Sequence, residues 1–172
     1  PGPGLGGHCI PIDPYYLSWK AREYDYSIRL IETSGEINES MPNFVVEKAS
    51  RILNGFKKSV NGANIILLGV AYKSDIDDYR ESPSLKIIEL LEEMGANLTI
   101  YDPHIKEFKL AGKMRQGADG ITEKEVADAD LVLLLTNHTA YDYAMIKKNA
   151  KAIFDTKNGF KGFENRDKIW LL

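Results

Sequence analysis

NIILLGV, residues 64–70, is a continuous apolar run with the length of one strand. Such a run is typical of a strand buried on both faces of a parallel sheet, because helices cover both sides of that kind of sheet. Ser82 and Pro83 follow it and suit the start of a helix, since the hydroxyl can cap a free N–H group and proline presets the first helical φ. This stretch therefore predicts a strand, a loop and a helix, which is the first step of an α/β fold.

Helix and strand patterns continue to alternate along the rest of the chain. A helical stripe follows Pro83 and ends at Gly95, a residue that readily takes the left-handed conformation just beyond a helix. The alternating order predicts a Rossmann-like, doubly wound parallel sheet with right-handed crossovers. Further strands are predicted at residues 97–101, 131–135, 151–154 and 169–172, a capping box at residues 122–125 and a helix at residues 142–149.

Residues 15–53 have a helical pattern that precedes the predicted sheet. Pro42 interrupts this pattern and marks either a kink in a long helix or the first turn of a second helix. A long helix with an apolar stripe packs either on its own domain or on a partner subunit, and the pattern leaves both open. The stripe consists of Ile37, Met41, Val45, Ala49 and Ile52 or Leu53.

The composition is ordinary for a globular protein, and 172 residues give room for one domain with a helical appendage. A net charge of −3 argues against a nucleic-acid partner, and the lack of an apolar run of about 18 residues predicts no membrane span.

The single cysteine excludes an internal disulfide, and the histidines lack metal-ligand spacing, so we expect a cytoplasmic protein without a metal site. The opening Pro1-Gly2-Pro3-Gly4 has a loop composition with no element before it, which suggests a piece of a larger protein.

Cys9 lies in a segment rich in glycine and proline, residues 1–14, which we call the cysteine loop. A lone cysteine is most often a small buried hydrophobic residue. Gly6 and Gly7, together with the lack of any helix or strand periodicity, favour a second interpretation, in which backbone N–H groups and a reactive thiol face a ligand. Asp13 stands four residues further on and could orient a water molecule or proton carrier. No histidine is placed as the obvious base of a cysteine hydrolase.

The loop after the first strand is a second candidate site, because ligands of open α/β sheets bind beyond the carboxyl ends of the strands. This Lys73–Arg80 loop, residues 71–82, lacks the glycines of a dinucleotide-binding fingerprint. Lys73 and Arg80 can meet phosphate or hydroxyl oxygens, but they can equally pair with aspartates of the same loop. Asp102 and His138 follow later strands; we expect Asp102 to be a turn residue rather than a ribose ligand, and His138 to be structural.

Four segments together resemble the UDP-glucose/GDP-mannose dehydrogenase family, and they occur in the family's order over essentially the whole chain. His8 before Cys9 and the Ile-Pro-Ile-Asp-Pro after it are similar to the branch that acts on UDP-N-acetylhexosamines. UDP-N-acetylglucosamine is then the nearest expected substrate, with UDP-glucose and UDP-N-acetylmannosamine as alternatives. The segments are PGPGLGGHCIPIDPYYL (1–17), INESMP (37–42), GVAYKSDIDDYRESPS (69–84) and YDPH (101–104).

The resemblance implies an NAD-dependent oxidation of the sugar C6 alcohol to a uronic acid in two hydride transfers. Cys9 would be the nucleophile that holds the intermediate aldehyde as a thiohemiacetal and then as a thioester, and Asp13 would assist the thiol or a water molecule. Gly6 and Gly7 would bring backbone donors to the sugar. Lys73 would contact the sugar nucleotide.

The resemblance also divides the chain and points to what it lacks. Arg80 would reach the NAD phosphates from this domain, whereas the family's amino-terminal NAD-binding domain is missing, so we expect no turnover by this chain alone. The expected parts are the cysteine loop, a central helical dimerisation segment (15–58) and a UDP-sugar-binding Rossmann-like domain (59–172), with a homodimer formed through the central helices. The alternative function is a non-catalytic module that binds UDP-sugars or mediates dimerisation, in which Cys9 is passive.

Overall fold

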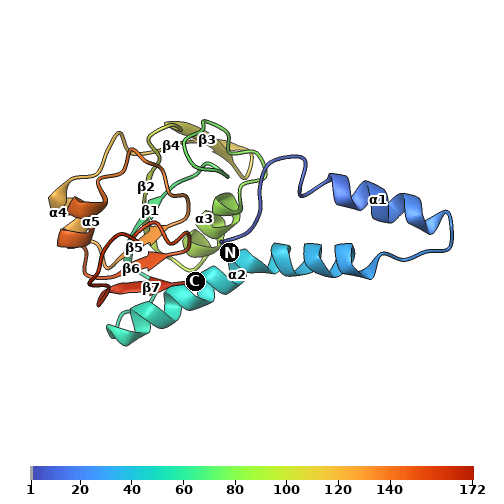
Figure 1. Cartoon of the computed structure of the whole chain (residues 1–172). Helices are drawn as coiled ribbons and strands as arrows, with labels where there is room; N and C mark the ends of the chain where they lie inside the picture. Colours follow the sequence, from blue (N-terminus) through green and yellow to red (C-terminus); the bar gives the residue numbers. More distant parts are fainter. Residues whose placement is uncertain (1) are drawn as a thin grey trace.

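The computed structural model describes residues 2–172, so Pro1, the first residue of the cysteine loop, lies outside the described residues. Its centre is a five-stranded sheet with the strand order β2-β1-β5-β6-β7 (Figure 1). Every neighbouring pair in this sheet is parallel, which confirms the predicted Rossmann-like architecture. The strands are β1 (Asn64–Leu68), β2 (Asn97–Tyr101), β5 (Leu131–Leu134), β6 (Ile153–Asp155) and β7 (Ile169–Leu171).

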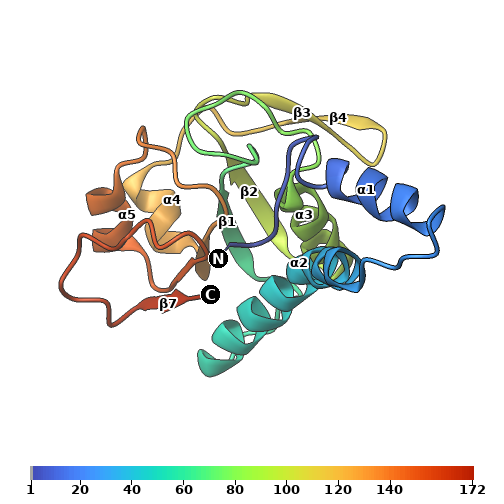
Figure 2. The ribbon, with the colours of Figure 1, turned by 45° about the vertical axis from the view of Figure 1, so that its right-hand side comes forward.

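Helices cover both faces of the sheet, as Figure 2 shows. Alternate residues of β1 point into two separate cores: Ile65 and Leu67 into one, Ile66 and Leu68 into the other. This alternation explains why the strand is apolar throughout, since neither of its faces meets water. The first core is covered by α2 (Arg29–Gly55) and α3 (Pro83–Glu93), the second by α4 (Glu123–Asp128) and α5 (Tyr143–Asn149).

The helix ends follow the signals in the sequence. The Ser82 hydroxyl accepts a hydrogen bond from the Ser84 N–H at 3.3 Å, and Gly95 takes the left-handed conformation (φ 81°) after α3. Thr122 and Glu125 form the predicted reciprocal capping box at the start of α4. These caps set where α3 and α4 begin, and therefore where the loops that precede them end.

The helical segment before the sheet is two helices, α1 (Asp13–Arg22) and α2, and not one uninterrupted pattern. The prediction is wrong at residues 23–28, where Asp25 adopts a left-handed conformation (φ 54°) and the Tyr26 N–H bonds back to the Ala21 carbonyl at 3.2 Å. This backbone bond ends α1 as a helix-terminating turn does, although no glycine marks the position.

Pro42 lies inside α2 and does not begin another helix. Figure 1 shows α2 bending part-way along its length, as expected where proline removes a helical hydrogen bond. The burial of the apolar stripe changes near this bend. Val45, Ala49 and Leu53, after the bend, are buried against the sheet, whereas Ile37, before it, is 59% exposed. The carboxyl-terminal half of α2 therefore packs on its own domain, as one of the two interpretations held.

α1 packs on the amino-terminal half of α2 and, with it, projects away from the sheet (Figure 1). Tyr15 lies so close to Gly35 that a Cβ at that glycine would fall 1.7 Å from the tyrosine oxygen. Ser18 and Arg22 both donate to the Glu32 carboxylate, at 2.7 and 2.6 Å. The contact thus depends on a small residue in α2 and on polar bonds more than on an apolar core.

A two-stranded antiparallel hairpin, β3 (Glu107–Leu110) and β4 (Lys113–Gln116), follows β2 and was not predicted from the sequence. Its two-residue turn uses Ala111 and Gly112, both with positive φ. Within residues 2–172, no helix is long and apolar enough to cross a membrane.

Candidate functional site

The strand order creates a switch point between β1 and β5, because the chain leaves β1 toward β2 on one side and returns to β5 on the other. The carboxyl ends of such a strand pair are where open α/β sheets bind ligands. The Lys73–Arg80 loop follows β1, and residues 135–139 follow β5. Both loops therefore meet at the expected ligand-binding edge of the sheet.

Cys9 is exposed, so the interpretation of a buried structural cysteine is wrong. Its carbonyl accepts hydrogen bonds from the Ile12 N–H at 3.2 Å and the Asp13 N–H at 2.8 Å. Asp13 is the exposed first residue of α1, two residues before the helical pattern was expected to begin. The thiol thus stands at a tight turn immediately before a helix, one turn away from a carboxylate.

The cysteine loop is seated on the Lys73–Arg80 loop. The Gly7 N–H donates to the Arg80 carbonyl at 3.0 Å, and Gly7 has a left-handed φ of 81°. A Cβ at Gly6 would lie 2.5 Å from the Tyr72 Cβ and 2.8 Å from the Glu81 carbonyl oxygen. Glycine is therefore required at both positions by close packing and by backbone conformation. The two segments singled out in the sequence form one surface.

Arg80 is paired within its own loop, as one of the two sequence interpretations allowed. Its guanidinium donates bidentate hydrogen bonds to the Asp78 carboxylate, with Nε 3.0 Å from Oδ1 and a terminal nitrogen 2.7 Å from Oδ2. These side-chain bonds and the Arg80 backbone N–H lower the pKa of Asp78 to about 2. The Arg80 side chain nevertheless remains 65% exposed, so its outer face can still meet an anion.

Lys73 is exposed and forms no hydrogen bond or ion pair within residues 2–172. It stands two residues from Asp75 on the same loop, at the carboxyl end of β1. A free ammonium at this edge of the sheet is available for a phosphate or hydroxyl oxygen.

Asp102 is the turn residue that the sequence favoured. Its Oδ1 accepts from the N–H groups of His104 (2.9 Å) and Ile105 (3.2 Å), and its Oδ2 from those of Val70 (2.7 Å) and Ala71 (3.0 Å). With both oxygens occupied and the residue 2% exposed, this carboxylate is not available to a ribose. It ties the turn after β2 to the turn after β1.

The pKa of Asp102 is lowered to about 2 although the group is buried. Burial alone would raise the pKa, but hydrogen bonds from His138 and from the backbone N–H groups of Ala71, His104 and Val70 outweigh it. The carboxylate is therefore ionised at any physiological pH.

Lys157 is a cation at this edge that the sequence reasoning missed. It follows β6 by two residues, and its Nζ would lie 2.9 Å from a Cβ at Gly2 in the cysteine loop. Partial burial lowers its pKa, and within residues 2–172 its ammonium forms no ion pair. The sequence signal that could have identified Lys157 is its position just after a buried apolar strand. The strand and the residues that follow it read KAIFDTK (151–157).

Asp75, His104 and His138 bring potential metal-ligand atoms within 4.8 Å of one another. Both nitrogens of His138 are already used, however: Nδ1 lies 2.9 Å from the Asp75 backbone nitrogen, and Nε2 lies 3.1 Å from Asp102 Oδ2. A buried imidazole without a free lone pair cannot also bind a metal ion, so the cluster is a hydrogen-bonded network.

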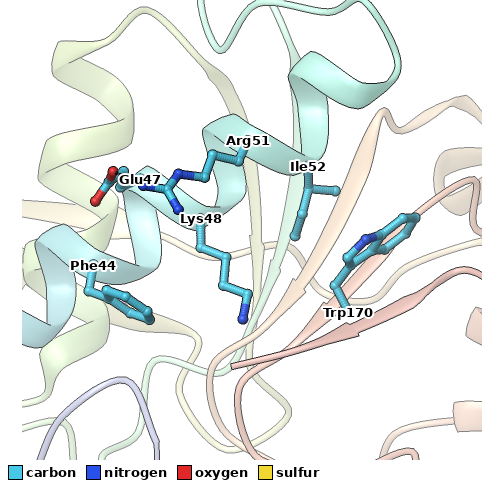
Figure 3. Close-up of a pocket in the computed structure, with 6 residues that line it drawn as sticks. All are labelled: Phe44, Glu47, Lys48, Arg51, Ile52 and Trp170. Atoms are coloured by element: carbon cyan, nitrogen blue, oxygen red, sulfur yellow. Dashed lines mark hydrogen bonds and ion pairs between the residues drawn. The ribbon is translucent and has the colours of Figure 1, made fainter.

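Hollows lie along the helices, and one of them reaches the place where the cysteine loop meets the Lys73–Arg80 loop. A cavity of about 900 Å³ runs between the cysteine loop, α1, α2 and the start of α3, and its walls are mostly apolar. A smaller one of about 250 Å³ lies between α2 and β7, where Figure 3 shows Lys48 and Arg51 on the helix and Trp170 on the strand. Cys9 and Lys73 line neither cavity, but Ile10, Glu81 and Ser82 line the larger one, which therefore adjoins the junction of the two loops.

Comparison with known proteins matches two domains of one family along the chain. Residues 66–162 match the UDP binding domain of the UDP-glucose/GDP-mannose dehydrogenase family, and residues 1–40 match the central domain of that family. The boundaries predicted at residues 14 and 58 are not tested by these matches.

Several named relatives cover most of this chain. The UDP-N-acetyl-D-mannosamine dehydrogenase of Methanocaldococcus jannaschii is 37% identical over 92% of the chain, and the NDP-N-acetyl-D-galactosaminuronic acid dehydrogenase of Ralstonia nicotianae is 35% identical over 82%. The solved structure of the UDP-D-ManNAc dehydrogenase from Pyrococcus horikoshii is 32% identical over 99% of the chain, with a TM-score of 0.80.

The chain spans about a third of the length of these proteins: 35% and 31% of the two relatives and 38% of the solved chain. The family model for the UDP binding domain matches 97 of the 172 residues, from 66 to 162. The sequence resemblance is thereby confirmed, and the parallel sheet matches the family's solved structures. This chain belongs to the UDP-glucose/GDP-mannose dehydrogenase family.

Proposed function

We propose that this chain is the part of an NAD-dependent nucleotide-sugar 6-dehydrogenase that carries the nucleophile and binds the UDP-sugar. The observation that supports this most is the seating of the cysteine loop on the Lys73–Arg80 loop, at the carboxyl ends of the parallel strands. One surface thereby presents a thiol and two cations. A phosphorylated sugar with an oxidisable carbon fits such a surface, because a cation can hold the phosphates while the thiol meets the carbon.

Lys73 is proposed to contact the diphosphate, since its ammonium is exposed and free of partners within residues 2–172. Gly6 and Gly7 lie beside the sugar in this proposal. The Gly7 N–H already donates to the Arg80 carbonyl, so Gly7 contributes close approach of the backbone and not a hydrogen bond. Lys157 adds a further cation beside Gly2 of the cysteine loop.

Cys9 supplies covalent catalysis in this proposal. Attack of its thiol on the C6 aldehyde forms a carbon–sulfur bond, and the thiol proton ends on the former aldehyde oxygen, which gives a thiohemiacetal. Loss of a hydride from C6, together with loss of the hydroxyl proton to water, converts this adduct into a thioester. Water then cleaves the carbon–sulfur bond, releases the carboxylate and restores the thiol, with Asp13 assisting the proton transfer.

NAD, when bound, supplies the acceptor for the two hydrides. Of the residues in this chain, Arg80 suits a contact with its phosphates, because the guanidinium remains 65% exposed despite the Asp78 pair. The sequence after β1 lacks a dinucleotide fingerprint. We therefore assign most of the NAD contacts to an amino-terminal domain outside this chain.

The substrate class is a UDP-N-acetylhexosamine. The names of relatives at 32–37% identity favour UDP-N-acetylmannosamine, whereas the sequence around Cys9 suggested UDP-N-acetylglucosamine. UDP-glucose remains the third candidate. A reducing cytoplasmic compartment suits the mechanism, because Cys9 must stay a free thiol between turnovers.

A homodimer through α1 and the amino-terminal half of α2 completes the proposal. Both elements, and the turn that joins them, expose large apolar side chains that a monomer in water would leave uncovered. Those exposed by more than half are Tyr16, Leu17, Trp19, Tyr24, Tyr26, Leu30 and Ile37.

The reaction is tested in the protein that contains this chain together with its amino-terminal domain. We expect two NADH per UDP-sugar consumed and, in acid-quenched samples, a sugar adduct on the peptide that contains Cys9. The 172-residue chain alone should reduce no NAD. One NADH per sugar without an adduct would contradict the covalent mechanism. Alkylation of Cys9 at a rate that UDP-sugars leave unchanged would instead support the passive binding module.

A further inference from the structure

Asp75 is the strained centre of the Lys73–Arg80 loop. Its backbone has a left-handed φ of 59°, which is costly for a residue other than glycine. The Asp75 Oδ1 accepts hydrogen bonds from the Thr139 N–H at 2.8 Å and the Thr139 hydroxyl at 3.1 Å. These bonds fasten the side chain of Asp75 to the loop that follows β5, but its backbone N–H still needs an acceptor of its own.

His138 supplies that acceptor. Its Nδ1 lies 2.9 Å from the Asp75 backbone nitrogen, and its Nε2 lies 3.1 Å from Asp102 Oδ2. A backbone N–H can only donate, so Nδ1 carries no proton; the Asp102 carboxylate can only accept, so Nε2 carries one. The partners therefore define a neutral imidazole with a single tautomer, and the ring is fully buried.

Asp102 extends this link back to the start of the loop. Its Oδ2, which accepts from His138, also accepts from the N–H groups of Val70 and Ala71 at 2.7 and 3.0 Å. One carboxylate and one imidazole thus join the beginning of the loop to its centre at Asp75. Lys73 lies between these two anchored points.

We infer that His138 is a positioning residue for the UDP-sugar: its neutral imidazole fixes the Asp75 backbone and thereby presents Lys73 to the diphosphate. This inference rests on the proposed function for the identity of the ligand. It assigns His138 a second role beyond filling the core, because its Nδ1 bond acts directly on the centre of the loop, whereas its Nε2 bond reaches only the start of the loop through Asp102.

Two substitutions separate the two bonds of the ring. His138→Asn places an amide oxygen where Nδ1 stands and keeps the acceptor for Asp75, whereas His138→Gln places an amide nitrogen near Nε2 and keeps the donor for Asp102. We expect His138→Asn to bind UDP within about threefold of wild type. We expect His138→Gln to weaken UDP binding about tenfold, because the part-buried Asp75 N–H loses its acceptor.

The probe is UDP itself, titrated calorimetrically into the 172-residue chain, with amide hydrogen exchange measured over residues 71–80. Exchange in this segment should accelerate at least about tenfold in His138→Gln and remain near wild type in His138→Asn. Val126→Ala, which truncates a buried side chain beneath α4, is the control for lost stability. It should leave both the UDP affinity and the exchange of residues 71–80 unchanged.

The outcomes distinguish this inference from the proposed function. Equal exchange of residues 71–80 in His138→Asn and His138→Gln would overturn the positioning role, whether or not UDP binds. Equal UDP affinity in the two variants would overturn it as well. A third outcome is that the wild-type chain does not bind UDP, while amide exchange of residues 71–80 is still faster in His138→Gln than in His138→Asn. His138 would then be the residue that orders the loop, and UDP would be refuted as the ligand.

Discussion

At the scale of single residues, the site depends on an exposed thiol. Cys9 is exposed and its side chain fills no part of either core, so Cys9→Ser should change the free energy of unfolding by less than about 0.5 kcal/mol. In the protein with its amino-terminal domain, the same change should stop formation of the uronic acid, because serine is a far weaker nucleophile at neutral pH. Thermal denaturation and NADH formation measure the two effects.

A Cys9→Ser variant that lost several degrees of melting temperature would contradict the exposed position. Uronic acid formed at the wild-type rate would contradict the covalent role of Cys9.

Asp102 makes stability depend on pH in the acid range. Its pKa is about 2 in the folded protein against 3.8 for the unperturbed group, so its contribution is present above pH 3.8 and is lost as the pH falls toward 2. Asp102→Asn should destabilise the chain at pH 7 and flatten the fall in stability between pH 4 and 2. Urea unfolding at pH 7, 4 and 2 measures this. Parallel pH profiles for both proteins would show that Asp102 does not cause the fall.

At the scale of elements, the glycines of the cysteine loop decide whether the two loops meet. Gly6→Ala would place a Cβ 2.5 Å from Tyr72 and 2.8 Å from a backbone oxygen of Glu81, and the cost of such overpacking is about 1–3 kcal/mol. Gly120→Ala is the matched control, because a Cβ there meets nothing within 4 Å. Calorimetric unfolding should show a loss for Gly6→Ala only, with UDP binding weakened alongside. Equal stability of the two variants would mean that the loops do not pack as described.

Elements with strong local signals could be predicted from the sequence, and those without could not. The apolar run at residues 64–70 and the caps at Ser82 and Thr122 gave the strands and helices around the sheet, with ends within two residues of those observed. The hairpin was missed because β4 has four exposed residues, Lys113–Gln116, and so has no alternating apolar pattern. The end of α1 was missed because Asp25, and not glycine, takes the left-handed conformation.

Some features of the candidate site could likewise be predicted from the sequence, and others could not. Cys9, Lys73 and Arg80 stood out through residue type and loop position, but the acceptor role of His138 depends on three loops that meet only in the folded protein. The pairing of Arg80 with Asp78 was one of two open interpretations, because side-chain partners two residues apart depend on the turn between them.

At the scale of the whole molecule, the projecting pair of α1 and α2 should be covered by a second copy. Trp19 and Leu30 are 65% and 79% exposed, so Trp19→Glu and Leu30→Glu should each weaken the dimer by at least about tenfold, since a buried unpaired charge opposes association. Met114→Glu, at an exposed site of the hairpin, is the control. Sedimentation equilibrium measures the change. A wild-type chain that sediments as a monomer at every concentration would contradict the dimer.

Binding of a UDP-sugar at the carboxyl edge of this sheet through Lys73 is tested most directly by a calorimetric titration of the chain and of Lys73→Met. UDP-N-acetylmannosamine, UDP-N-acetylglucosamine, UDP-glucose and NAD are the ligands. We predict that a UDP-N-acetylhexosamine binds the wild-type chain most tightly, that NAD does not bind, and that Lys73→Met weakens the UDP-sugar about tenfold or more. Unchanged affinity in Lys73→Met, or binding of NAD without a UDP-sugar, would contradict the account.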